Sequence, residues 1–479
     1  MRMLGVALLL AVAATDVAAQ PFAYAASGVS ASLYVIDTAS SQRVATVSLP
    51  SGTTVNGLVV SRDGTRVYAL SPTAGTVVAV NAQSNTLIGS ITAGPSPAAL
   101  ALTSSGGTLY TANGNATVLR GATTASSLGS GVQINADPTH LVFNPDETSL
   151  YVAHRSGTLT TITTSSLTVA STATLLGTPV AITLNSAGTR LYMVDSTGAL
   201  QTVDPSTGSL LSSRSTGLSN PTAMALSPNG QRIVITDGVA GTAIVMDVTT
   251  GQLLATLTVV GTPQSVAIHP SSTYAYVVGR GGATASVIDL SAATPTLSGT
   301  ITLPERSERI ALAPTTPTAA TPQTGWWWNS SESGRGFSFE TNSARLFFAW
   351  YMYASDATAT WYPTNTTISG SYSGTLDQYT GGQTLSGSYR AASPRGSSWS
   401  VRAVFFSNSY GALVWPGGLT AIQRYEFVSG GLTSGAASGM PQTGWWWNPS
   451  EAGRGFFIEA QSTTLFLAGF TYDDRGEPV

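Results

Sequence analysis

Cysteine and lysine are both absent from this sequence of 479 residues. Without cysteine the chain can form no disulfide, no thiolate metal site and no thiol nucleophile. All 20 basic residues are arginine, charged residues make up only 9% of the chain, and the net charge is −3 with no basic run. Because tracking of nucleic-acid phosphates needs a basic surface, we expect no nucleic-acid partner.

Histidine is also scarce, with only His140, His154 and His269 in the whole chain. A metal centre or a histidine-based triad needs several ligands or partners in a fixed pattern, and no such spacing surrounds these three residues. We therefore predict no metal and no cofactor.

Long hydrophobic runs are missing too, since a membrane span needs about 20 apolar residues. The longest run, Leu4 to Ala14, follows Arg2 and precedes the small residues Val17-Ala18-Ala19. A basic start, an apolar core and small residues are typical of a signal peptide, here residues 1–19. We predict an exported protein, periplasmic or at the cell surface, with no transmembrane span. An uncleaved N-terminal strand is the alternative.

Glycine, serine, threonine and valine are plentiful, which favours short strands and turns. The segment that starts at Pro97 returns with a period near 42. Each repeat contains four short apolar runs separated by turn residues, the pattern of a β-propeller blade. The repeats start at Val55, Pro97, Pro138, Pro179, Pro221, Pro263 and Ser307.

The two ends of the repeat region complement each other. The N-terminus supplies Tyr24, Tyr34–Asp37 and Val44–Val47, which match the second, third and fourth strands of a blade. The missing innermost strand is Ile310–Ala313 at the other end. We therefore predict an all-β fold with a seven-bladed propeller over residues 20–314, in which one blade is split between the two ends.

The repeats resemble the YVTN-type β-propeller family, a WD40-like group of exported proteins. The matching segments are Leu33–Thr38, Leu150–Ala153 and Ser286–Asp289. The resemblance implies a propeller fold. It does not select an activity, because the family includes surface-layer proteins, proteins assigned as lactonases and relatives of quinoprotein dehydrogenase subunits.

A second region begins after a Pro/Thr linker at residues 315–321, since all ten Trp lie from Trp326 onward. Pro322–Asn329 recurs identically as Pro441–Asn448, at an offset of 119 residues. This duplication defines an aromatic-rich module at 322–429, a Gly/Ser linker at 430–440 and a shorter second copy at 441–479. The unit resembles a tandem WWNP-ESG-GF module of exported proteobacterial proteins, and we expect small antiparallel barrels or sandwiches.

The second copy is too short to fold alone, yet it is rich in aromatic side chains. Either it docks on the first copy, with its strands extending the edge of that sheet, or the chain is a fragment of a longer protein. The ending Asp474–Val479 is typical of a turn within a hairpin that leads into a further strand, which favours the fragment.

Short motifs in the aromatic region have structural explanations. Gly334-Arg335-Gly336 lacks the full phosphate-loop pattern and predicts a tight turn. Two Glu/Arg pairs, Glu332 with Arg335 and Glu451 with Arg454, are expected to stabilise equivalent turns.

The tryptophan triplets are the candidate ligand-binding residues. Successive side chains of a strand alternate, so Trp327 must point away from Trp326 and Trp328, and at least one ring of each triplet can be exposed. An exposed tryptophan ring is a suitable platform for binding sugars or peptidoglycan. The alternative is that these rings pack in the hydrophobic core. The candidates are Trp326, Trp327, Trp328, Trp445, Trp446 and Trp447.

The propeller channel offers few acids or bases. Of the seven positions expected at its mouth, five are Gly, Ala or Ser, which leaves His140 and Arg309, with Asp137 and Glu308 nearby. A hydrolase needs a charged constellation that holds substrate and water. We therefore predict a non-enzymatic scaffold that binds a protein or an envelope glycan. The alternative is a lactonase-like or quinoprotein-dehydrogenase-associated propeller that uses the channel mouth.

Overall fold

The computed structural model describes residues 22–313, 321–332, 334–342, 345–353, 357–367, 372–448, 450 and 455–479. The predicted signal peptide at 1–19 and all but the last residue of the predicted linker lie outside these residues. The described chain forms two compact units. The propeller unit contains residues 22–313 and Val404–Gln423, and the aromatic unit contains residues 321–403 and Arg424–Val479.

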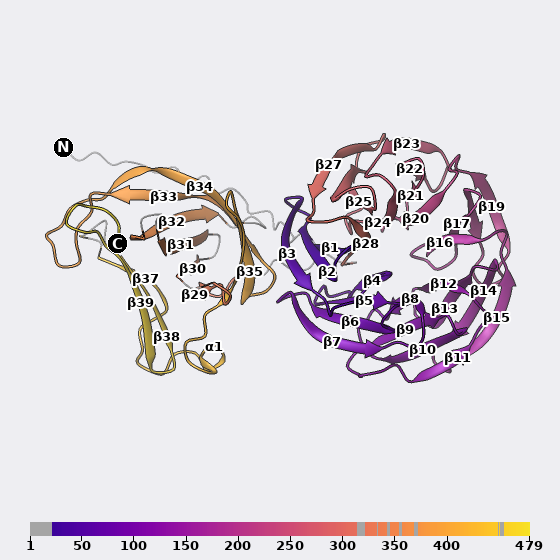
Figure 1. Cartoon of the computed structure of the whole chain (residues 1–479), viewed down its shortest axis with the longest axis horizontal. Helices are drawn as coiled ribbons and strands as arrows, with labels where there is room; N and C mark the ends of the chain where they lie inside the picture. Colours follow the sequence, from indigo (N-terminus) through magenta and orange to yellow (C-terminus); the bar gives the residue numbers. More distant parts are fainter. Residues whose placement is uncertain are drawn as a thin grey trace, which may run out of the picture. The chain divides into compact units, whose positions relative to one another are not determined.

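The propeller unit contains seven four-stranded antiparallel sheets arranged radially, which confirms the predicted blades (Figure 1). Their strands, in chain order, are β1 (Phe22–Ser27), β2 (Ser32–Asp37), β3 (Gln42–Ser48), β4 (Gly57–Val60), β5 (Arg66–Ser71), β6 (Thr76–Asn81), β7 (Thr86–Thr92), β8 (Pro97–Leu102), β9 (Thr108–Asn113), β10 (Thr117–Ala122), β11 (Ser130–Gln133), β12 (Pro138–Phe143), β13 (Ser149–His154), β14 (Thr158–Thr163), β15 (Thr168–Thr174), β16 (Pro179–Leu184), β17 (Leu191–Asp195), β18 (Ala199–Val203), β19 (Leu210–Ser215), β20 (Pro221–Leu226), β21 (Arg232–Asp237), β22 (Thr242–Asp247), β23 (Leu253–Thr258), β24 (Pro263–Ile268), β25 (Tyr274–Gly279), β26 (Thr284–Asp289), β27 (Thr296–Thr302) and β28 (Ser307–Leu312).

The ring closes through the split blade, as predicted. Strand β28 joins β1, β2 and β3 in one sheet, with Ala311 opposite Tyr24 and Ile310 opposite Ala25. The innermost strands contact one another in the closed series β4, β8, β12, β16, β20, β24, β28 and back to β4. Closure pairs edges that would otherwise stay open at the two ends of the repeat array.

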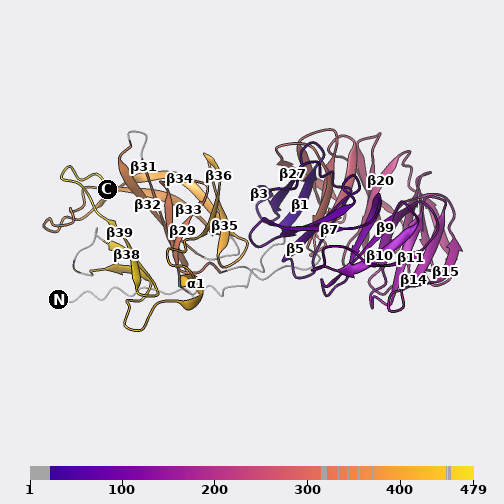
Figure 2. The ribbon, with the colours of Figure 1, turned by 60° about the horizontal axis from the view of Figure 1, so that its bottom comes forward.

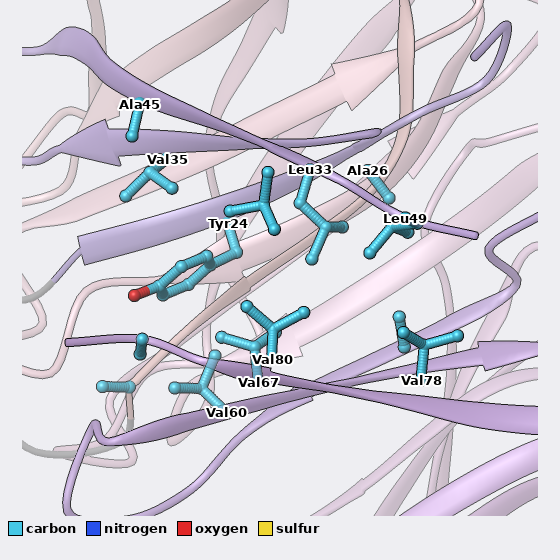
Figure 3. Packing of buried hydrophobic residues seen from close by; sticks show 14 of the residues in the cluster. Tyr24, Ala26, Leu33, Val35, Ala45, Leu49, Val60, Val67, Val78 and Val80 are labelled. Carbon is cyan, nitrogen blue, oxygen red and sulfur yellow. The ribbon is translucent and has the colours of Figure 1, made fainter. Parts of the chain in front are cut away.

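Neighbouring blades are held together by apolar side chains from facing sheets. Between the first two blades, Tyr24, Leu33 and Val35 pack against Val67 and Val80, all nearly or fully buried (Figure 3). Burying one such side chain contributes about 1.5–3 kcal/mol relative to its exposure. The same alternation of apolar residues therefore stabilises every blade interface.

Buried polar side chains end the second strand of several blades. Asp237 is fully buried, and its carboxylate accepts main-chain N–H groups from Ser219, Asn220, Val239 and Ala240. These bonds fix the loops on both sides of the strand end, because buried polar groups need partners. The equivalent positions hold Asn113, His154 and Asp195, which are also buried.

Strands also dominate the aromatic unit, which confirms the all-β fold class. The remaining strands of the chain are β29 (Gly325–Trp328), β30 (Gly336–Asn342), β31 (Arg345–Tyr353), β32 (Ala359–Thr367), β33 (Tyr372–Thr380), β34 (Ser393–Phe405), β35 (Tyr410–Trp415), β36 (Gly418–Arg424), β37 (Gly444–Trp447), β38 (Gly455–Gln461) and β39 (Thr464–Phe470). Strands β29 to β32 form an antiparallel ladder, and β32 lies against β33 of the β33–β34 pair, so the sheet curls. The one helix in the described residues is the single turn α1 (Gly431–Ser434).

The second copy forms its own three-stranded sheet of β37, β38 and β39. This sheet lies against the first copy, and Figure 2 shows β38 and β39 near β29. Strand β38 contacts β29, and β37 contacts β30. The 39-residue copy therefore lies against the first copy as a separate sheet, and does not extend the edge of the first copy's sheet as the docking alternative expected. That the chain is a fragment of a longer protein remains a prediction.

The hairpin of β35 and β36 packs on the first propeller blade. Phe406, Val414 and Leu419 lie against the apolar cluster of that blade, and the rings of Phe406 and Phe22 meet edge to face at 5.1 Å. Residues Val404–Gln423 consequently belong to the propeller unit.

Candidate functional site

The inner strands of the propeller carry the two candidate residues of the channel. His140 lies on β12 and keeps part of its surface accessible, and Arg309 lies on β28. Burial, and to a smaller extent the positive charge of Arg309, lower the pKa of His140 to about 4. His140 is therefore neutral at physiological pH, and its Nδ1 has no partner among the described residues.

Hydrogen bonds to other parts of the chain occupy the Arg309 guanidinium. Its Nε donates to the carbonyl oxygen of Asn56 at 2.7 Å, and its Nη2 donates to the Asn56 side chain. Its Nη1 donates to the Glu308 carbonyl oxygen at 2.8 Å. Burial lowers the pKa of Arg309, while the charge of Glu308 partly offsets this effect. Arg309 thus joins the last inner strand to the loop before the first, a structural role.

The acids near the channel are engaged elsewhere. The Glu308 carboxylate pairs with Arg280 at 2.9 Å, and the charge of Asp137 acts on His154. His154 is fully buried and bonds to the Ala136 carbonyl oxygen and the Thr160 hydroxyl. In the part of the chain that the structure describes, no group of three or more His, Asp or Glu side chains is placed to hold a metal ion. The described helix is too short to cross a membrane.

The first tryptophan triplet lies on β29 and shows the expected alternation. Trp326 contacts Tyr351, Phe457 and Phe466, whereas the Trp327 ring packs on Phe339 inside the curled sheet. Both rings are buried, with exposed fractions of 4% and 1%. Trp328 is partly exposed and lies against Tyr425. Of this triplet, only Trp328 presents accessible surface to a ligand.

The second triplet, on β37, is more exposed. Trp445 is partly buried against Phe347, Phe457 and Phe470. Trp446 and Trp447 are 45% and 65% exposed. The two tryptophan triplets therefore have identical sequences but differ in solvent exposure.

Two equivalent carboxylates cross-link the copies. Glu459 of the second copy accepts the main-chain N–H of Trp326, and Glu340 of the first copy accepts that of Trp445. Because Trp326 and Trp445 are equivalent, as are Glu340 and Glu459, the two bonds are related by an approximate two-fold axis. The aromatic contacts obey the same relation, since Trp326 meets Phe466 and Trp445 meets Phe347.

A buried ion pair strengthens one of these links. Arg424 donates to both carboxylate oxygens of Glu459, at 2.6 and 3.2 Å, and also to the Trp326 carbonyl oxygen. Gln461 adds a bond to Glu459 at 2.8 Å. Arg424 and Glu459 are almost wholly buried, so each charge depends on the other for compensation. No role was predicted from the sequence for Glu340, Glu459 or Arg424. The identical placement of the two glutamates was the available signal.

An aromatic groove of about 460 Å³ is formed within the aromatic unit. It is bordered by β29, β31 and β32 of the first copy and by β39 of the second. Its lining residues are Trp326, Trp327, Trp328, Gly334, Arg335, Gly336, Tyr351, Met352, Tyr353, Ala359, Thr360, Trp361, Tyr425, Phe466, Leu467, Ala468, Gly469 and Val479.

Polar groups are few in this groove. The Arg335 guanidinium donates to Glu332, which confirms the predicted pair across that turn. The second predicted pair, Glu451 with Arg454, lies outside the described residues. The ring N–H groups of Trp326 and Trp328 are buried, and neither has an acceptor within the described ranges. The groove is therefore lined by apolar rings, and two of them, Trp326 and Trp328, carry ring N–H groups without an acceptor among the described residues.

Comparisons with known proteins support the fold. No family model and no curated protein matches this chain. Solved structures do resemble it. The Bacteroides fragilis protein named "putative 6-phosphogluconolactonase" is 14% identical, has a TM-score of 0.53, and aligns over 62% of this chain and 99% of its own.

Two further structures show the same likeness. A functionally unknown protein from Desulfotomaculum acetoxidans is 15% identical, with a TM-score of 0.53 over 61% of this chain and 98% of its own. Hydrazine synthase of Kuenenia stuttgartiensis is 16% identical, with a TM-score of 0.50 over 56% of this chain and 92% of its own. At these identities the resemblance concerns the propeller fold alone.

Proposed function

We propose that this protein is an exported, non-enzymatic binding protein of the YVTN-like propeller type, in which the aromatic groove binds an envelope glycan. The observation that carries the proposal is the groove itself, which is lined by aromatic rings, two of them (Trp326 and Trp328) with indole N–H groups that have no acceptor among the described residues. A sugar ring presents an apolar face of C–H groups and a rim of hydroxyl oxygens. The rings suit the former, and the N–H groups suit the latter after a small adjustment of the indoles.

The accessible residues of the groove support this assignment. Tyr353 is 58% exposed and Trp328 partly exposed, so their rings are open to a ligand. Arg335 keeps a quarter of its side chain exposed beside them and can donate to a hydroxyl or a carboxylate of the glycan. Most of the groove is uncharged, which fits a mainly neutral saccharide.

The channel gives less support to the lactonase-like alternative. Hydrolysis would require a general base and a group that stabilises the developing negative charge. His140 has a pKa of about 4, and Arg309 is engaged by Asn56 and Glu308. The structural neighbours named "putative 6-phosphogluconolactonase" are 14% and 15% identical to this chain, which shows a shared fold alone.

A binding screen with the full chain tests the proposal. Glycan arrays and envelope polysaccharides should yield a ligand whose affinity falls at least tenfold in Trp328→Ala and in Tyr353→Ala, because each truncation removes a ring of the groove. Tyr389 is 53% exposed and lies outside the groove, so Tyr389→Ala is the matched control and should bind within twofold of the parent protein. Binding that none of the groove substitutions alters would contradict the proposal.

A further inference from the structure

The interface between the two module copies is formed by equivalent residues on both sides. Trp326 of the first copy packs on Phe466 of the second, with 4.8 Å between the ring centroids. Trp445 of the second copy packs on Phe347 of the first, with 4.7 Å between the centroids. The carboxylate bonds to the two tryptophans are exchanged in the same way. Such reciprocity is the property of an isologous interface, the type that joins identical subunits.

Every molecule of this protein carries both halves of the interface. The face of the first copy around Trp326 and Phe347 is therefore matched by the second copy of any other molecule, with the same rings and the same carboxylate. Long-range repulsion between two molecules is small, because the net charge is only −3 and charged residues make up 9% of the chain. A second molecule thus offers the first copy the same surface that it already binds.

The segment that joins the copies is bonded to the second copy. The Gln461 side-chain oxygen accepts the main-chain N–H groups of Phe427 and Val428 at 3.1 and 3.2 Å. The turn at Ser462 accepts the N–H of Ala437 and donates its own to the Gly435 carbonyl oxygen. These bonds stay intact if the second copy leaves the first, so residues 427–479 can move as one body.

A hinge lies directly before this body. The Tyr425 N–H donates to the Trp326 carbonyl oxygen at 2.8 Å, which ties Tyr425 to the first copy. Glu426, the next residue, is exposed and lies outside any strand. Gln461 Nε2 donates to the Tyr425 carbonyl oxygen across the hinge at 2.9 Å, a bond that a second molecule can remake. A change of backbone conformation at Glu426 therefore suffices to release the second copy, and short hinges of this kind favour exchange between molecules.

We propose that the module interface is homotypic, and that two molecules of this protein form a dimer by exchanging residues 427–479. The first copy of each molecule then binds the second copy of the other, and the contacts of the monomer are retained. The aromatic groove is consequently built from two chains, because Phe466, Leu467 and Gly469 belong to the exchanged segment. Each dimer has two such grooves.

Concentration decides between the monomer and the dimer, since both have the same contacts. A second copy linked to its own first copy has an effective concentration of about millimolar. Exchange is therefore favoured when molecules are crowded or are refolded together. An envelope polymer that binds several molecules side by side supplies such crowding, a point that rests on the proposed function.

The test uses two full-length variants of the buried ion pair, each with a different affinity tag. Glu459→Arg places two guanidinium groups together, and Arg424→Glu places two carboxylates together, in a site that is almost wholly buried. Each variant is mismatched within its own chain and in a dimer of identical chains. In a mixture, the native Arg424 of one variant meets the native Glu459 of the other, and the two introduced charges meet at the second interface.

After unfolding and refolding together, the mixture should contain a one-to-one dimer that carries both tags. Light scattering and tandem affinity purification should show at least tenfold more of it than of dimers in either variant refolded alone. The matched control has both substitutions in one chain, which restores opposite charges within the molecule, and should stay monomeric. A mixture without the two-tag dimer overturns the proposal. A dimer that forms equally well in one variant alone lies on another surface and overturns it too.

The parent protein provides a second measurement that does not depend on the folding of the variants. Two tagged preparations refolded together at about millimolar concentration should yield two-tag dimers, because exchange then competes with the linked copy. Their absence at that concentration overturns the proposal. Dimers that form while the protein binds no glycan would refute the proposed function and leave this inference standing.

Discussion

The main-chain N–H of Trp326 donates to the carboxylate of Glu459, 133 residues further along the chain. The equivalent bond joins Trp445 to Glu340. Each copy of the aromatic module therefore supplies the acceptor for the first tryptophan of the other. A glycine with positive φ precedes each of these tryptophans, Gly325 at 144° and Gly444 at 147°. This reciprocity explains how a segment too short to fold alone obtains a defined structure.

The buried ion pair predicts a large loss of stability in Glu459→Ala. The substitution leaves the Arg424 guanidinium buried without its counter-charge, which costs about 3–5 kcal/mol. Glu340→Ala is the natural comparison, because Glu340 is less buried and loses mainly one main-chain bond, worth about 1–3 kcal/mol. Denaturant unfolding followed by tryptophan fluorescence measures both values. Equal losses in the two variants would show that the ion pair adds nothing.

The two glycines predict a second asymmetry. A Cβ at Gly325 would meet the buried Arg424 guanidinium, whereas a Cβ at Gly444 would lie 3.1 Å from the Glu340 carboxylate. Both positions have φ values that L-residues rarely adopt, so each alanine substitution costs about 1–3 kcal/mol. We expect Gly325→Ala to be the more destabilising, measured by thermal unfolding. A larger effect at Gly444 would mean that Arg424 moves aside without cost.

Ring closure predicts that a change in the split blade affects the whole propeller. Ile310 is 5% exposed in β28, so Ile310→Ala should remove about 2–5 kcal/mol from the unfolding free energy. Leu297→Ala, at a position of β27 that is 43% exposed, is the control and should cost less than about 0.5 kcal/mol. Circular dichroism should show one cooperative transition shifted as a unit. A separate early transition confined to part of the β signal would argue against closure.

Two histidines predict a loss of stability in mild acid. Burial lowers the pKa of both His140 and His269 to about 4, below the ordinary value near 6.5. Between about pH 4 and pH 6.5 the unfolded state therefore binds more protons than the folded state. The free energy of unfolding thus keeps its full value above about pH 6.5 and decreases as the pH drops toward 4. At pH 4.5 His140 should account for a decrease of roughly 2 kcal/mol in the free energy of unfolding. In His140→Gln this contribution to the acid destabilisation should be absent. An NMR titration that places the His140 pKa near 6.5 would refute this expectation.

The sequence by itself determined the propeller and its split blade. The period near 42 residues indicates a repeating unit whose hydrogen bonds are mostly local. The two ends of the repeat region complement each other, so Ile310 and Ala311 must complete the sheet that starts at Phe22. Alternation along a strand also determined that Trp326 and Trp327 face opposite ways. These features depend on residues that are near each other in the chain or repeated along it.

Only the tertiary structure decided which aromatic rings are accessible. Trp327 and Trp446 occupy identical GWWWN segments, yet one is 1% exposed and the other 45%. The difference comes from strands β32 to β34 in the later part of the first copy, which have no counterpart over the second copy in the described residues. The pairing of Glu459 with Trp326 and Arg424 was likewise decided by packing. A sequence pattern specifies which way a side chain points, but burial depends on distant segments that cover it.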